Sequence, residues 1–98
     1  MTINQKREDE KLTIKIDGRI DTITAPELEA FINDNIAGVK ELVFDLSDME
    51  YTSSAGLRVF LLTQKKMAGQ GEMIIENVQS DVMEVFEITG FSDFLTFR

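Results

Sequence analysis

The chain has 98 residues, enough for one domain, with 43% hydrophobic and 29% charged residues and a formal charge of −8. It contains no histidine and no cysteine, which excludes a Ser-His-Asp triad, a thiolate nucleophile, disulfide bonds and metal ligands of the imidazole or thiolate kind. The negative charge repels nucleic-acid backbones and anionic lipids, so we expect neither as a partner. Because histidine and cysteine are missing, we also expect no catalysis, and we expect no cofactor or metal.

The N-terminal segment predicts two antiparallel strands. Apolar and polar residues alternate over 12–16, which is typical of a strand with one buried face. The polar residues 2–7 are expected to form an edge strand that pairs with it through a turn at 8–11. Gly18 is expected to end the second strand.

A first helix is predicted to begin at Thr24. Thr24 and Glu27 have the spacing of a capping box, and Pro26 suits the first turn. Gly38 is expected to end the helix. Its predicted buried face consists of Leu28, Phe31, Ile32 and Ile36.

Residues 41–46 form a nearly continuous apolar run, which is typical of a central strand covered on both faces by helices. The following residues 47–50 are predicted to form a polar turn. Asp45, Asp48 and Glu50 could be considered as metal ligands, but a solvated acidic turn is the favoured interpretation.

A second helix is predicted to begin within two residues of Ser53 and to end at Gly69. Its expected core residues are Leu57, Phe60, Leu61 and Ala68. A turn of 100° per residue then puts Val59 and Leu62 on the opposite side, beside Arg58. This exposed apolar pair is either a docking surface or a chance feature of the surface.

The rest of the chain repeats the alternation of strand and helix. We expect a buried strand at 73–75, a third helix capped by Ser80 and ended by Gly90, and a last strand at 94–97. The third helix is expected to bury Val82, Val85 and Phe86. The sequence therefore predicts one α/β domain over 1–98, with a small, mostly parallel sheet of four or five strands, an antiparallel N-terminal edge strand and three main helices.

Ser53 and Ser54 lie at the predicted N-terminus of the second helix. Unpaired N–H groups and a partial positive charge make this position tolerant of a phosphoryl group. By spacing alone, the favoured reading is that one of the serines merely caps the helix. A nucleophile elbow is excluded, because it needs glycine where Thr52 stands.

Residues 45–47, 51–57 and 59–62 together resemble the signature of the anti-sigma-factor antagonist family, whose members are STAS domains. In that family the serine two residues before the glycine of the signature accepts phosphate from a partner kinase, and here that serine is Ser54. The chain departs from the pattern where Ser53 replaces an aspartate and Ala55 replaces a hydroxyl residue. Ser54 is thus the favoured acceptor, and Ser53 is a decoy, a cap or a second, less favoured acceptor. The resemblance extends to residues 18–21 and 89–91.

The resemblance implies a partner switch. The unphosphorylated protein would bind an anti-sigma factor with serine-kinase activity and free a sigma factor for transcription, for example in a stress response. Phosphorylation would release the complex, and a serine phosphatase would reset it. The expected partner-binding residues are Asp21, Thr52, Ser53, Ser54, Arg58, Val59 and Leu62.

Two further expectations accompany this reading. The residue types around Asp21 favour a turn or capping role, to which the resemblance adds a place on the partner-binding surface. The polar start of the chain is unlike a signal peptide, and no apolar run approaches the roughly 20 residues that span a bilayer, so we expect a cytoplasmic protein.

Two other functions remain open. A STAS-type accessory subunit of a membrane transporter would need no membrane segment of its own, since it docks on protein. Binding of a small molecule or nucleotide at the N-terminus of the second helix is less favoured, because the acidic loops around it oppose an anionic ligand.

Overall fold

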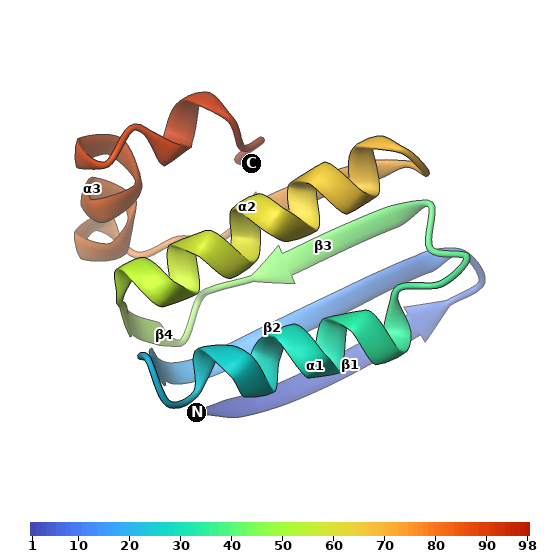
Figure 1. Ribbon diagram of the computed structural model, residues 1–98, viewed down its shortest axis with the longest axis horizontal. Helices are drawn as coiled ribbons and strands as arrows, with labels where there is room; N and C mark the ends of the chain where they lie inside the picture. The colour runs from blue at the N-terminus through green and yellow to red at the C-terminus, as the bar shows by residue number, and fades with distance from the viewer.

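The structure, a computed structural model, describes residues 1–98 as one mixed five-stranded sheet with helices packed on it (Figure 1). Strands β1 to β4 span Thr2–Glu8, Lys11–Ile20, Glu41–Asp45 and Met49–Thr52, and β5 spans Glu72–Glu76. The helices are α1 (Ala25–Asn35), α2 (Ser54–Ala68) and α3 (Ser80–Ile88), and a 3-10 turn covers Phe91–Asp93. The α/β class, the antiparallel N-terminal edge strand and the three main helices are confirmed.

Strand β2 is the axis of the sheet. It pairs antiparallel with β1 over its first seven residues, and parallel with β3 over Lys11–Lys15. The prediction that Gly18 ends this strand is wrong. The register shifts between Gly18 and Arg19, and β2 then continues to Ile20 in parallel with β4. The strand order is β1-β2-β3-β5, with β4 beside β2 only.

The fifth strand differs from the predicted one. Part of the predicted polar turn at 47–50 belongs to β4, whose end residues Met49 and Thr52 are buried. The predicted strand at 94–97 is reduced to a single bridge between Phe97 and Ile75. Strand β4 could not be recognised locally, because only its pairing with the far end of β2 makes its four residues a strand.

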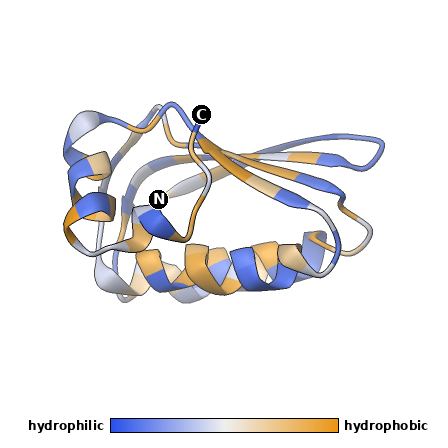
Figure 2. Cartoon of the chain, turned by 90° about the horizontal axis from the view of Figure 1, so that it is seen from above, coloured by the Kyte–Doolittle hydropathy of each residue, from blue (hydrophilic) through white to orange (hydrophobic).

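Both long helices cover the same face of the sheet, as Figures 1 and 2 show. Alternate residues of β2, β3 and β5 point under them and are buried: Leu12, Ile14, Ile16, Leu42, Phe44, Met73 and Ile75. The expectation that helices cover both faces is wrong. Val43 on the opposite face is only 1% exposed, because it stands in register between Thr13 of β2 and Ile74 of β5.

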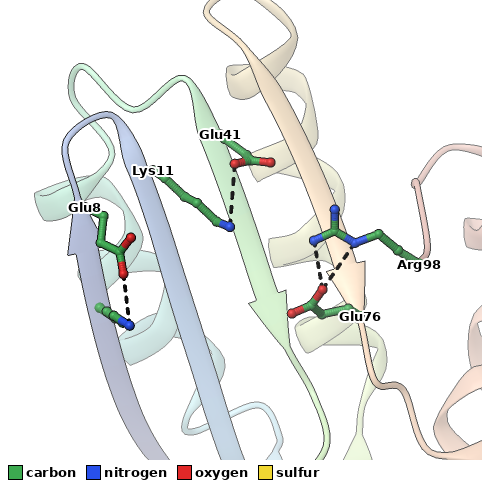
Figure 3. Close-up of polar contacts among 6 residues, drawn as sticks. Glu8, Lys11, Glu41, Glu76 and Arg98 are labelled. Atoms are coloured by element: carbon green, nitrogen blue, oxygen red, sulfur yellow. Dashed lines mark hydrogen bonds and ion pairs between the residues drawn. The ribbon is translucent and has the colours of Figure 1, made fainter.

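The uncovered face carries ion pairs (Figure 3). Lys11 pairs with Glu41 at 3.8 Å between the nitrogen and the carboxylate oxygen, and Arg98 pairs with Glu76 at 2.9 Å. Lys6 and Glu8 form a third pair on β1 at 2.9 Å. Exposed pairs of this kind stabilise a fold by about 1 kcal/mol or less each, so this face is held by hydrogen bonding between strands rather than by charge.

A chain of aromatic side chains joins the layers. The rings of Phe44 on β3 and Phe60 on α2 have centroids 5.1 Å apart, and Phe60 lies 5.8 Å from Phe86 on α3. Phe86 lies 5.2 Å from Phe97, so the C-terminal segment completes the same cluster.

The helix α3 is capped by Gln79, one residue before the predicted Ser80, and its Val85 is only half-buried. None of the helices combines the length and apolar character needed to cross a lipid bilayer.

Candidate functional site

The candidate site lies where β4 ends and α2 begins; the start of a helix at this point was predicted, whereas the strand before it was not. Ser53 is the N-cap residue in an extended conformation, and Ser54 is the first residue of the helix. The Ser53 N–H donates a hydrogen bond of 2.9 Å to the Ile20 carbonyl, and the Leu57 N–H donates one of 3.1 Å to the Ser53 carbonyl. The start of α2 is therefore fixed to the end of β2.

Gly56 lets the first turn of α2 approach the strands. A Cβ atom at this position would lie 2.3 Å from Thr52 Oγ1 and 2.8 Å from Ile20 Cγ2. Thr52 itself is 3% exposed, and its hydroxyl donates to the Ser53 carbonyl at 3.1 Å. The prediction that Thr52 contacts a partner is therefore wrong for its side chain, which packs beneath the first turn of α2.

The two serines have opposite environments. Ser54 is exposed. The Oγ of Ser53 is buried and has no hydrogen-bond partner, so Ser53 caps the helix by its position but not by its side chain. An acceptor of a phosphoryl group needs an accessible hydroxyl, and only Ser54 offers one here.

Asp21 organises the neighbouring turn. Its Oδ1 accepts hydrogen bonds of 2.9 Å from the N–H groups of Thr24 and Ile23, and these bonds hold the pKa of the carboxyl below its usual value. The turn role is confirmed. The predicted capping box does not form: the Thr24 hydroxyl accepts from the Asp21 N–H at 2.9 Å instead.

This turn lies beside the serines, because Ile20 pairs with Thr52 across β2 and β4. It carries Ile23, which is 78% exposed and was not predicted as a surface residue. Its only sequence signal is an isoleucine among the polar residues of a turn.

The orientation of α2 corrects one predicted surface residue. Val59 is 3% exposed and belongs to the core, so it cannot contact a partner. Thr63 and Met67 are also buried, whereas Leu61 is only partly buried and Ala68 is exposed. Helix α2 carries apolar residues on more than one side. Their spacing alone therefore did not predict which side packs against the sheet.

The exposed side of α2, here called the α2 face, consists of Ser54, Arg58, Leu61, Leu62 and Lys65. These residues follow one another at spacings of three or four, with Leu61 and Leu62 adjacent, as one side of a helix requires. The sequence could have predicted that Leu61 lies on this face, because it follows Ser54 and Arg58 at helical spacing. The prediction instead counted the helical spacing from the core residue Leu57. The predicted site residues Ser54, Arg58 and Leu62 thus share one surface.

Two of the three acidic residues considered as metal ligands, Asp45 and Asp48, make other contacts. Asp45 accepts from the Ser47 N–H at 3.0 Å and from Asn77 at 3.2 Å, and Asp48 pairs with Lys15 at 2.9 Å. No group of three or more acidic residues is placed to hold a metal ion.

The largest cavity, about 260 Å³, is not at the site. It is lined by Gln64 and Thr96 among others, at the outer edge of β5. Gln64 lies ten residues after Ser54 on α2, which is about 15 Å along the helix axis.

Known proteins share this sequence pattern. A family model described as the STAS domain matches residues 2–98. The chain is 37% identical over 93 residues to BtrV of Bordetella bronchiseptica, which is named as a candidate anti-sigma factor antagonist; the match covers 93% of this chain and 80% of BtrV. It is 29% identical over 97 residues to the anti-sigma-B factor antagonist of Staphylococcus aureus, covering 97% of this chain and 90% of that protein.

Solved structures share the fold. An anti-sigma factor antagonist from Mycobacterium paratuberculosis has a TM-score of 0.88 at 26% identity, over 98% of this chain and 83% of that one. The unphosphorylated form of the anti-sigma factor antagonist SpoIIAA has a TM-score of 0.84 at 19% identity, over 99% of this chain and 88% of that one. At this lower identity the likeness concerns the fold alone.

Proposed function

This chain belongs to the STAS-domain family of anti-sigma factor antagonists, and from that premise we propose that it acts in the cytoplasm as a phosphorylation-controlled partner switch. Unphosphorylated, it binds an anti-sigma factor that is also a serine kinase, so that a sigma factor becomes available for transcription. Phosphorylated on Ser54, it releases the anti-sigma factor. A serine phosphatase restores the binding form.

One observation carries the choice of acceptor. Ser54 is exposed on the first residue of α2, whereas the Ser53 hydroxyl is buried beneath the same turn. A kinase can reach the Ser54 oxygen without unfolding the helix, whereas the Ser53 oxygen is buried in the folded chain.

The reaction itself belongs to the partner. The Ser54 hydroxyl oxygen attacks the γ-phosphorus of ATP, the bond to ADP breaks, and the hydroxyl proton passes to a base of the kinase. This chain supplies only the positioned hydroxyl, since it contains no histidine or cysteine. Its role is that of a binding protein and a substrate, not of an enzyme.

Release follows from electrostatics rather than from refolding. A phosphoryl group adds about 1.5 to 2 negative charges at neutral pH, and an added charge in a closely packed interface must be desolvated. The α2 face carries Ser54 two helical turns before the partly buried leucines Leu61 and Leu62, which can pack against a partner while Ser54 is uncharged. The fold need not change, because the exposed N-terminus of a helix accommodates a phosphate.

The test is a calorimetric titration of the anti-sigma factor with four forms of this protein: wild type, Ser54→Ala, Ser54→Asp and Ser80→Asp. Ser80 is a matched control, because it is an exposed first residue of another helix. We expect binding by wild type, Ser54→Ala and Ser80→Asp, and a loss of at least tenfold in affinity for Ser54→Asp. Equal affinity for the two aspartate variants would contradict the proposal.

The transporter alternative predicts a different partner. Capture with the unphosphorylated protein would retain a transporter ATPase instead of a kinase, and Ser54→Asp would leave that binding unchanged. The relatives named above favour the antagonist function, because both carry that designation in their names.

A further inference from the structure

We propose that Arg58 is the residue on which the switch acts: it pairs with a carboxylate of the partner while Ser54 is unmodified, and with the phosphate once Ser54 is phosphorylated. This inference deepens the proposed function and rests on it. The partner it describes is a protein surface with an acidic group beside an apolar patch.

The first step is the spacing on α2. Arg58 follows Ser54 by four residues, and both side chains are exposed on the α2 face. Residues four apart on a helix have Cβ atoms about 5–6 Å apart, which a guanidinium and a phosphate bridge readily. An arginine forms two parallel hydrogen bonds to a phosphate, a geometry that a lysine cannot provide.

The second step is that Arg58 has no partner in this structure, unlike most cations of the chain. Of the ten basic residues, seven make an ion pair, a hydrogen bond or a contact with an aromatic ring: Lys6, Arg7, Lys11, Lys15, Arg19, Lys66 and Arg98. The remaining three are Lys40, Arg58 and Lys65. Two of these three lie on the α2 face, so an anion that approaches this face displaces no existing contact.

The third step is the charge of α2 itself. The chain has 18 acidic and 10 basic residues, yet the 15 residues of α2 include Arg58, Lys65 and Lys66 and no acid. A basic, acid-free helix on an acidic molecule favours a partner of opposite charge, and complementary charges orient the approach of two proteins. Leu61 and Leu62 lie between Arg58 and Lys65 in the sequence, so the partner must offer apolar surface beside its carboxylates.

These three steps make the two pairings compete for the single positive charge of Arg58. A guanidinium that forms two parallel hydrogen bonds to the phosphate has its charge neutralised there, so its three remaining N–H donors bind a carboxylate of the partner more weakly. Phosphorylation therefore weakens the complex twice: it adds an uncompensated anion at the interface, and it withdraws the cation that held the partner's acid. An aspartate at position 54 is shorter and carries less charge, so it should weaken binding less than the phosphate does.

The phosphate pairing is tested without a kinase or a partner, on protein made with phosphoserine at position 54 by chemical ligation. The second pKa of the phosphate, about 6 when unperturbed, is followed by ³¹P NMR in wild type, Arg58→Gln and Lys65→Gln. Pairing favours the dianion, so the phosphate pKa should be lower in wild type than in Arg58→Gln by about half a unit. Lys65→Gln is the matched control: it lies 11 residues from Ser54, about 16 Å along the helix, beyond the screening length of roughly 10 Å. Equal phosphate pKa values in wild type and Arg58→Gln would overturn the pairing.

The partner contact is tested by titrating the unphosphorylated variants against the anti-sigma factor at two salt concentrations. Arg58→Gln should bind about tenfold more weakly than wild type, and its affinity should depend less on salt. Arg58→Lys should recover only part of the loss. Phosphorylation should reduce the affinity of Arg58→Gln by a smaller factor than that of wild type, and an equal factor would overturn the exchange. If unmodified wild type itself binds no anti-sigma factor, the proposed function and the partner contact are both wrong, while the NMR titration still decides the phosphate pairing.

Discussion

Gly56 packs against Thr52 more closely than any residue with a side chain could. The position of a Cβ on Gly56 falls 2.3 Å from the Thr52 hydroxyl oxygen, which is itself buried at the end of β4. The exposed Ser54 therefore belongs to a helix turn that packs directly against the sheet. This contact holds the first turn of α2 close to the ends of β2 and β4.

Gly56→Ala should destabilise the fold by about 1–3 kcal/mol, the usual cost of forcing an extra methyl group into a packed site. The cost arises even though alanine is the better helix former by about 1 kcal/mol. Urea unfolding measures the change. Gly69→Ala is the control, because a Cβ there meets its nearest atom only at 3.7 Å. A Gly56→Ala variant as stable as wild type would show that the turn can shift away from β4.

Ser53 and Ser54 should respond oppositely to alanine substitution. Ser54→Ala should abolish phosphorylation by the cognate kinase, and Ser53→Ala should leave one phosphate on Ser54, as mass spectrometry of the digested protein can locate. Ser53→Ala should also cost less than about 0.5 kcal/mol of stability, below the usual loss of roughly 1 kcal/mol at an N-cap serine, because its hydroxyl makes no capping bond. Phosphate found on Ser53 would refute the assignment.

Val59 and Leu61 should separate stability from binding. Val59→Ala removes buried methyl groups and should cost about 1–3 kcal/mol in unfolding free energy, with little direct effect on the affinity for the anti-sigma factor. Leu61→Lys and Leu62→Lys lie on the α2 face and should cost the fold about 1 kcal/mol or less. If these leucines are central contacts, either lysine should weaken binding by about 2 kcal/mol or more. Calorimetric titration and thermal melting of the same samples give both quantities, and unweakened binding by both lysine variants would remove the leucines from the interface.

Asp21 should contribute to the loss of stability in acid. Its pKa is lowered in the folded state by hydrogen bonds from the backbone N–H groups of Thr24 and Ile23. The unfolded chain therefore binds the proton more readily than the folded one. The stability that Asp21 supplies is complete above its unfolded pKa, about 3.9, and is lost as the pH falls through its lower folded pKa.

Asp21→Asn keeps an oxygen that can accept both hydrogen bonds but cannot titrate. Urea unfolding of both proteins between about pH 2 and pH 5 should show a shallower loss of stability for Asp21→Asn than for wild type. Asp21→Ala, which lacks the acceptor, should be less stable than wild type at neutral pH. Parallel pH profiles for wild type and Asp21→Asn would mean that the carboxylate charge adds nothing to this turn.

The secondary structure of most of the chain follows from local chemistry. The alternation in β2, the apolar run of β3 and the helical spacing between the serines and Gly69 are each visible within one continuous segment of the sequence. The bounds of α2 agree with those predicted, because an extended cap residue and a glycine stop are properties of short segments. Strand β4 was missed for the opposite reason: its four residues become a strand only through pairing with the end of β2, about 30 residues earlier in the chain.

The sequence by itself indicated the family and the position of the candidate site. The missing histidine and cysteine removed most catalytic chemistry, and the segment at 51–57 placed two hydroxyls at the start of a helix. The resemblance favoured Ser54 over Ser53, and only the tertiary structure shows that the Ser53 oxygen is buried, since this depends on how the turn meets the strands. The tertiary structure also decided that Val59 is buried in the core and that Leu61 is only partly buried. Both residues are apolar, so hydrophobic spacing fits either rotation of α2, and the packing of Gly56 against Thr52 and Ile20 selects the observed one.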